Sequence, residues 1–165
     1  GDAFNSRVNL NLREDKGYTY GARTQFSGGE DTGKFMAYAS VRSDVTGLSL
    51  AEFVKEINAY QASGMTDEES AFMRSSIAQS QALEYETPYQ KAGFLRMIQR
   101  YQLAQNFTAE QDQIVNSIST DELNKLASKL LNINDMVMLV VGDKTTVEPQ
   151  LKALGYQVEM VTLAD

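Results

Sequence analysis

Gly17 separates two segments whose side-chain periodicities are incompatible with a single element, and this junction constrains the fold more than any other feature. Apolar residues recur before it with the i, i+4, i+8 spacing of one helical stripe, at Phe4, Val8 and Leu12. This spacing predicts a helix over residues 4–15, which the glycine ends. The period changes to two directly afterwards, which predicts a strand over residues 18–26.

The strand over residues 18–26 is expected to pair with a second strand over residues 34–42. Seven residues rich in Gly, Glu and Asp separate the two runs and are typical of a turn. The first strand is predicted to place Arg23 and Gln25 on one face, and the residues expected on its other face are Tyr18, Tyr20, Ala22, Thr24 and Phe26. The two runs together predict an antiparallel hairpin.

Helices are predicted from there to about residue 130. Five segments carry a Ser/Thr-x-x-Glu/Gln capping box, in which two side chains bond the free amides of a helix start. They are Ser49-to-Glu52, Thr66-to-Glu69, Thr87-to-Gln90, Thr108-to-Gln111 and Ser119-to-Glu122. An apolar stripe at helical spacing follows each box, so five helices are expected.

The C-terminal part has a β-α-β pattern. Residues 136–141 are apolar on both faces, as in an interior strand, and residues 158–161 form a second short apolar run. A helix over residues 147–154 lies between them. We therefore predict an α+β fold in one domain over residues 1–165, with a mostly antiparallel sheet and helices packed on one side.

Composition excludes several kinds of site. The 22 acidic and 15 basic residues give a net charge of −7, which disfavours nucleic-acid binding, and Lys91, Arg96 and Arg100 are expected on a solvated helix face. The chain has no His and no Cys, so it lacks the commonest zinc ligand and general base and all thiolate ligands. No apolar run approaches the ~20 residues of a membrane span.

The segment from Leu12 to Ala22, with Phe4-Asn5-Ser6-Arg7 before it, resembles the C-terminal half of bacterial zinc peptidases of the insulinase/pitrilysin (M16) family. A looser match continues to about residue 155. The resemblance implies the αβ roll of M16 and LuxS-type metallohydrolases. In that family a strand and a helix precede this segment, so we expect an N-terminally truncated domain, with Gly1 as the tail of an upstream Leu-Gly-Gly motif.

The resemblance also implies roles for two residues. In the family an arginine and a tyrosine seven residues later reach from this half to the zinc site, which here designates Arg13 and Tyr20. The tyrosine hydroxyl would donate to the substrate carbonyl, and the arginine would anchor the substrate. Tyr18 competes for a substrate-binding role. On composition and spacing alone, Arg13 could instead end a helix and Tyr20 could be a half-buried strand aromatic.

The family holds zinc through an inverted His-x-x-Glu-His motif. No segment of this chain supplies it, so the chain is expected to bind no cofactor, to be inactive alone, and to act on peptides with a zinc-bearing N-terminal half. That half could belong to the same polypeptide or to a partner subunit. A third alternative is a non-catalytic relative, such as a respiratory-complex core protein or a chaperone-like binder. The sequence of this motif resembles that of bacterial envelope zinc proteases, which favours a location in the periplasm.

Overall fold

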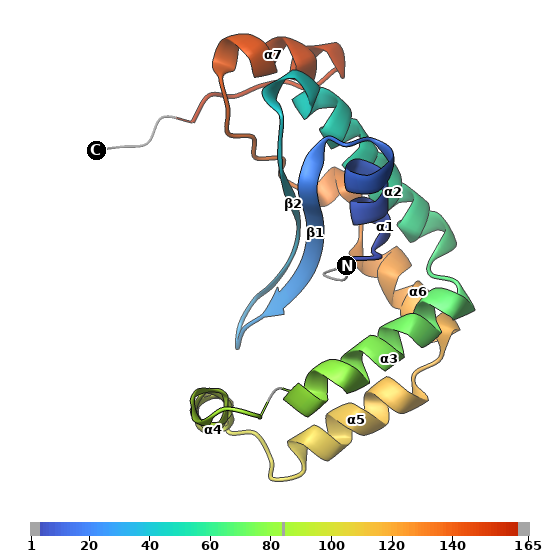
Figure 1. The fold of residues 1–165 in the computed structure, drawn as a ribbon, viewed down its shortest axis with the longest axis vertical. Coiled ribbons are helices and arrows are strands. Elements are labelled where there is room, and N and C mark those ends of the chain that lie inside the picture. Colours follow the sequence, from blue (N-terminus) through green and yellow to red (C-terminus); the bar gives the residue numbers. More distant parts are fainter. Residues whose placement is uncertain (1–3, 84, 162–165) are drawn as a thin grey trace. The chain divides into compact units, whose positions relative to one another are not determined.

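The computed structural model describes residues 4–83 and 85–161, and among these residues it is an α+β structure with a single antiparallel pair of strands (Figure 1). The α+β class predicted from the sequence is confirmed. Its contacts divide the chain into two compact units. Unit 1 contains the described residues up to Ala59 and from Leu131 onward, and unit 2 contains Tyr60–Leu130. The predicted glycine motif at Gly1 lies outside the described residues.

The elements follow one another closely along the chain. Unit 1 contains α1 (Arg7–Asn9), the π-helix η1 (Leu10–Asp15), β1 (Thr19–Gly28), β2 (Gly33–Val41), the 3-10 turn η2 (Ser43–Val45), most of α2 (Thr46–Ser63), the 3-10 turn η3 (Ile133–Asp135) and α7 (Lys144–Ala153). Unit 2 contains the end of α2 with α3 (Asp67–Leu83), α4 (Pro88–Tyr101), α5 (Phe107–Ser117) and α6 (Thr120–Leu130).

The predicted hairpin is confirmed. β1 and β2 are antiparallel, with Arg23 opposite Tyr38 and Phe26 opposite Phe35. One face of the hairpin is covered in unit 1, where α1 and the first part of α2 lie beside it (Figure 1). Phe26 and Phe35 contact each other with ring centroids 5.0 Å apart, on the same side of the strands as Ala22.

The first predicted helix is partly π-helical. Residues 10–15 take the wider π turn, in which the Lys16 N–H reaches the Asn11 carbonyl at 3.0 Å. Val8 and Leu12 of the predicted stripe are buried, but the prediction was wrong for Phe4, which lies in a turn before α1 and is 56% exposed. The buried stripe starts at Val8, and not at Phe4, because the helix begins only at Arg7.

The core of unit 1 joins the first helix to the sheet. Val8, Leu12 and Ala22 form one buried cluster, and Ala39 of β2 and Phe53 of α2 pack against it. Leu12 is fully enclosed. Burying a leucine side chain stabilises a fold by about 1.5–3 kcal/mol, so this cluster fixes the position of the segment that follows.

A polar contact holds η1 on α2. The Asn11 amide nitrogen donates to Glu52 Oε2 at 2.8 Å and to Glu56 Oε1 at 2.6 Å. The hydrogen bond from Asn11 lowers the pKa of the Glu52 carboxyl below its ordinary value of 4.5, and Lys55 acts in the same direction. Asn11 is itself buried. This contact was not predicted from the sequence.

Helix α7 packs against the N-terminal end of α2 and is hydrogen-bonded to it. Gln150 of α7 accepts the Gly47 N–H at 2.9 Å and donates to the Ser43 carbonyl at 2.7 Å. A Cβ at Gly47 would lie 2.9 Å from the Gln150 Cβ, so this close approach requires glycine. The capping box predicted at Ser49 was wrong: α2 begins at Thr46, after a 3-10 turn, and Ser49 is buried inside the helix.

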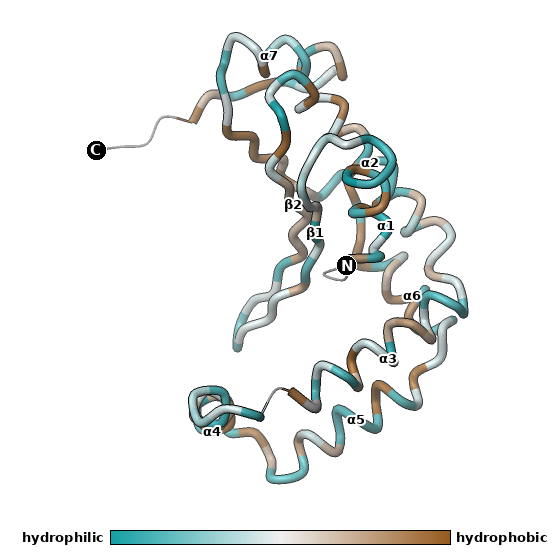
Figure 2. The backbone as a smooth tube through the Cα atoms, in the orientation of Figure 1, coloured by the Kyte–Doolittle hydropathy of each residue, from teal (hydrophilic) through white to brown (hydrophobic). Residues whose placement is uncertain are grey.

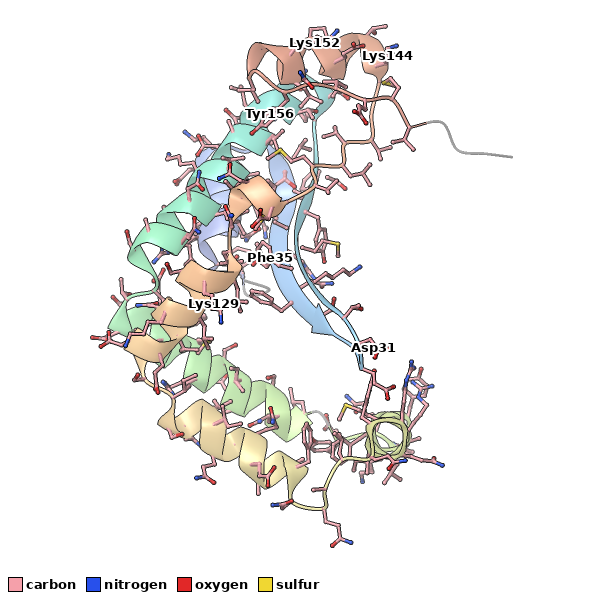
Figure 3. The ribbon with its side chains drawn as sticks, turned by 180° about the vertical axis from the view of Figure 1, so that it is seen from behind. Asp31, Phe35, Lys129, Lys144, Lys152 and Tyr156 are labelled. Carbon is pink, nitrogen blue, oxygen red and sulfur yellow. The ribbon has the colours of Figure 1, made fainter. Side chains whose placement is uncertain are left out.

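The helices of unit 2 begin largely as predicted. Reciprocal hydrogen bonds form the capping boxes at Thr66, Thr87 and Ser119. The box predicted at Thr108 was wrong, because α5 begins at Phe107 with Asn106 at its N-cap. The Arg74 guanidinium of α3 donates to the Val115 and Ile118 carbonyls, which holds α3 beside the end of α5, as Figures 1 and 3 both show.

The strands predicted at residues 136–141 and 158–161 do not form in the described part of the chain. Residues 136–141 are extended, but no other described strand pairs with them, and Val137 and Val141 are 94% and 92% exposed. Figure 2 shows this segment as a hydrophobic stretch between α6 and α7. The predicted helix after it is confirmed as α7, which starts earlier because Asp143 accepts the Thr146 N–H at 2.9 Å. None of the described helices is both long and apolar enough to cross a bilayer.

Gly64 allows the tight exit from α2 within unit 2. Its φ is +68°, and a Cβ there would occupy the space of the Asn124 amide carbon. Asn124 uses that amide to bond the Met65 backbone on both sides, accepting its N–H at 2.8 Å and donating to its carbonyl at 3.1 Å. The connection between α2 and α3 therefore depends on a residue without a side chain.

We expect Gly64→Ala to lower the free energy of unfolding by more than ~1 kcal/mol, because alanine is strained at positive φ and displaces Asn124. Urea unfolding measures this. Gly93→Ala is the matched control, since a Cβ at Gly93 in α4 meets nothing within 4 Å. That variant should be neutral or more stable by up to ~1 kcal/mol. Equal stability of the two variants would contradict the role of Gly64.

Glu52 predicts a pH dependence of stability. Because its pKa is lowered in the folded state, the ionised carboxylate stabilises the fold above the ordinary value of 4.5, and this stabilisation is lost as the pH falls through the lowered pKa. Glu52→Gln should therefore melt below wild type near neutral pH, and the gap should close in acid. Melting curves over a pH series test this, with exposed Glu68→Gln as control. A gap that stays constant with pH would exclude the mechanism.

Candidate functional site

A β-bulge turns Tyr20 out of the sheet. Thr19 faces Val41 and Ala22 faces Ala39, so Tyr20 and Gly21 together oppose Ser40 alone. Such an extra residue bends the strand and redirects a side chain. Tyr20 is 99% exposed, whereas Ala22 is buried. The prediction that these two residues share a face was wrong, because the bulge shifts the alternation by one residue.

The backbone groups at the bulge are bonded by two side chains. The Asn9 side-chain oxygen accepts the Ala22 N–H at 3.0 Å, and its amide nitrogen donates to the Phe4 carbonyl at 2.8 Å. Thr19 Oγ1 accepts the Gly21 N–H at 3.0 Å and lies 2.7 Å from the Ser40 carbonyl. Asn9 is 4% exposed. Because the Asn9 and Thr19 side chains hydrogen-bond the backbone of the bulge, its conformation is fixed, and so is the direction of the Tyr20 side chain.

Arg13 lies in the π-helical turn that precedes β1. Its Nε is 3.3 Å from Glu14 Oε1, and its guanidinium carbon is 4.5 Å from the centre of the Phe4 ring. The side chain is 38% exposed. Single π turns are rare and occur often at functional sites. The stacking on Phe4 orients the guanidinium plane, and the exposed ion pair with Glu14 is weak enough for another acceptor to replace it.

Backbone and side-chain hydrogen bonds hold the junction between η1 and β1. The Tyr18 N–H reaches the Leu12 carbonyl at 2.8 Å, and the Arg42 side chain donates to the Gly17 carbonyl at 2.9 Å. Gly17 has a φ of +60°, which permits the reversal. Tyr18, the competing candidate, precedes the strand and is half-buried, so it is less available to a ligand than Tyr20.

Sequence reasoning missed Asn9, because an asparagine within a helical run gives no sign that it bonds a strand 13 residues later. The described residues include no group of three or more Asp, Glu, His or Cys side chains that could hold a metal ion. The donor groups of the described residues therefore do not fit a catalytic zinc. What the junction offers is one neutral phenol donor and one permanent cation.

We expect Asn9→Ala to lower the free energy of unfolding by about 1–3 kcal/mol, because it leaves the buried Ala22 N–H without an acceptor. Chemical denaturation measures the loss. Asn58→Ala, at an exposed position of α2, is the control and should change stability by less than ~0.5 kcal/mol. If the two substitutions cost the same, the bulge does not depend on Asn9.

Two of three comparisons with known proteins found a similarity. Residues 1–76 match the family model described as the peptidase M16 inactive domain. A crystal structure of a peptidase M16 inactive domain from Pseudomonas fluorescens superposes with a TM-score of 0.70 and 21% sequence identity, over 79% of this chain and 31% of that one. No curated protein matches the chain in sequence.

The chain thus spans about a third of the length of the solved protein that it resembles, and the shared fold extends beyond the residues that the family model matches. The match begins in unit 1 and contains the helix, the π turn and the hairpin that carry Arg13 and Tyr20. The family model over residues 1–76 and the fold shared over 79% of the chain thus make it similar to an M16 inactive domain.

Proposed function

We propose that this domain is the substrate-binding half of a zinc-dependent peptidase. It contributes Tyr20 and Arg13 to a metal site carried by a second half, which is either part of the same polypeptide or a partner subunit. The observation that carries the proposal is the bulge in β1, which presents Tyr20 to solvent at 99% exposure on buried, dedicated hydrogen bonds. An aromatic residue kept for packing would lie on the covered face of the hairpin.

Tyr20 supplies a neutral hydrogen-bond donor. A tyrosine hydroxyl keeps its proton at neutral pH and can donate to a carbonyl oxygen as negative charge develops on it during attack by water. The donor is useful only if it is oriented before the reaction begins. The Asn9 and Thr19 hydrogen bonds support that orientation, because they hold the Ala22 and Gly21 amides of the bulge directly after Tyr20.

Arg13 supplies a permanent cation. A guanidinium cannot lose its proton near neutral pH and offers several donors, so it binds a substrate carbonyl or carboxylate without changing charge state. Its present partner, Glu14, is 47% exposed, and such pairs contribute only about 0–1 kcal/mol. A substrate oxygen can therefore displace Glu14 at little cost, while Phe4 keeps the guanidinium in place.

The metal has to be held elsewhere. The chain contains no histidine or cysteine, and the described residues form no cluster of carboxylates that could replace them. This is compatible with the family description of the domain as inactive. The polarised water and the general base would come from the other half, and Tyr20 and Arg13 would act on the substrate from this side.

The family model describes an inactive domain, and this also favours a second candidate function. The candidate is a non-catalytic M16-like subunit that binds a protein or peptide without cleaving it. The two candidates differ in what they require of Tyr20. A binding subunit needs only its exposed ring, whereas the peptidase half needs the hydroxyl. The presence of both Arg13 and Tyr20 at the family spacing supports the peptidase half.

Tyr20→Phe removes the hydroxyl and keeps the ring, so in the complete protein we expect kcat for a peptide substrate to fall about 10²–10³-fold. Zinc content should not change, because the chain has no His or Cys and its described residues form no group of carboxylates that could hold the ion. Steady-state peptide cleavage with a metal assay tests both points. Arg13→Ala is expected to raise KM as well.

Two controls separate the site from general effects. Tyr89→Phe makes the same change at an 87% exposed tyrosine of α4 in unit 2 and should leave kcat unaltered. Tyr18→Phe tests the competing tyrosine of the same segment. Full turnover of both Tyr20→Phe and Arg13→Ala would overturn the proposal and favour the non-catalytic candidate. A loss in Tyr18→Phe alone would reassign the hydroxyl donor.

A further inference from the structure

Asn11 joins the π-helical turn η1 to α2 through a single amide group. Its nitrogen carries two hydrogens, and it donates to Glu52 Oε2 at 2.8 Å and to Glu56 Oε1 at 2.6 Å. The two glutamates are one helical turn apart on α2, so their carboxylates lie on the same side of that helix and repel each other. The Asn11 amide therefore bridges two like charges.

The other polar atom of the Asn11 side chain is buried without a use. Its Oδ1 has no hydrogen-bond partner among the described residues, and an unpaired buried oxygen costs about 1–3 kcal/mol. An apolar side chain could fill the same space without that cost. The asparagine is therefore explained by the geometry that its two donated hydrogen bonds impose, and not by stability alone.

The hydrogen bonds of Asn11 set the direction of Arg13, two residues further along η1. Leu12, between them, is fully enclosed in the core, so successive residues of the turn are anchored on α2 and beside the hairpin. The Lys16 N–H closes the π turn on the Asn11 carbonyl at 3.0 Å. With the turn fixed in this way, the Arg13 guanidinium carbon lies 4.5 Å from the centre of the Phe4 ring.

We propose that Asn11, held by Glu52 and Glu56, is a positioning residue for Arg13. Its two hydrogen bonds to α2 keep the guanidinium over Phe4, where it can bind a substrate oxygen. This rests on the proposed function, which assigns the substrate to Arg13. Asn11 itself is buried against α2 and does not reach the substrate. Without its hydrogen bonds, η1 relaxes toward the more common α-helical turn, and Arg13 leaves its place.

The first measurement follows the Arg13 Nε–H signal in the nitrogen–proton NMR spectrum of the full chain, which does not require turnover. Arg13→Lys identifies the signal by removing it, and Phe4→Leu shows how far the ring shifts it. Asn11→Ala should move the signal toward its position in Phe4→Leu. Asn58→Ala, at an exposed position of the same helix, is the matched control and should leave it in place.

A charge swap separates positioning from a folding defect. Asn11→Asp keeps the shape of the side chain but places a third carboxylate against Glu52 and Glu56, so it should displace the Arg13 signal at least as far as Asn11→Ala. Adding Glu52→Gln and Glu56→Gln reverses both hydrogen bonds, because the new amides donate to the new carboxylate. This triple variant should return the signal to its wild-type position.

In the complete protein the same link appears as a split between KM and kcat. Asn11→Ala should raise KM for the peptide substrate by about tenfold and change kcat by less than about twofold, because Tyr20 keeps its own support from Asn9. In the Arg13→Ala background, Asn11→Ala should have no further effect on KM, because the residue through which it acts is gone.

The outcomes separate this inference from the proposed function. If Asn11→Ala leaves the Arg13 signal in place, or raises KM equally with and without Arg13, the positioning role is wrong whatever Arg13 does. If the signal moves and the charge swap restores it, but Arg13→Ala leaves KM unaltered, Asn11 positions Arg13 and the proposed role of Arg13 on the substrate fails. A triple variant that melts cooperatively with its signal still displaced overturns the role of Glu52 and Glu56.

Discussion

The hydrogen bond from the Ala22 N–H to the Asn9 side chain connects the two elements on which the rest of unit 1 depends. Asn9 ends α1, and Ala22 is the first residue of β1 that resumes the ladder after the bulge. Both residues are buried, so the bond is shielded from water. It sets the helix, the strand and the direction of Tyr20 at once, and Val8 and Leu12 pack around it.

The sequence predicted the features of this region that depend on local chemistry. Period-two alternation identified the hairpin, and Ser/Thr side chains with a Glu or Gln three residues later identified three helix starts. These succeed because each is decided within a few residues. Ser49 and Thr108 have the same pattern and failed, because the chain was already helical before them.

The candidate site was only partly predictable. Arg13 and Tyr20 were found through a family resemblance. The exposure of Tyr20, however, depends on contacts between residues that are far apart in the sequence. A bulge shifts the alternation by one residue, and nothing in the spacing from Tyr18 to Phe26 announces it. The sequence likewise does not predict the π turn at residues 10–15, since the spacing of Val8 and Leu12 fits an α-helix as well.

The two faces of the β1–β2 hairpin carry side chains of different kinds. Ala22 and Ala39 keep the covered side small and apolar beside Val8 and Leu12, which lets the helix approach closely. The alternation then leaves the other side free for polar and aromatic residues. The exposed residues on that side contribute little to folding and can change without loss of the core.

The extended run at residues 136–141 has a consequence for the behaviour of the chain in solution. Six successive apolar residues with high strand propensity, exposed at Val137, Leu139 and Val141, form the kind of window that recruits other chains by edge pairing. Asp135 and Asp143 stand on either side of it, and both are exposed. Stacking several copies would bring these carboxylates into register, and their mutual repulsion opposes such association.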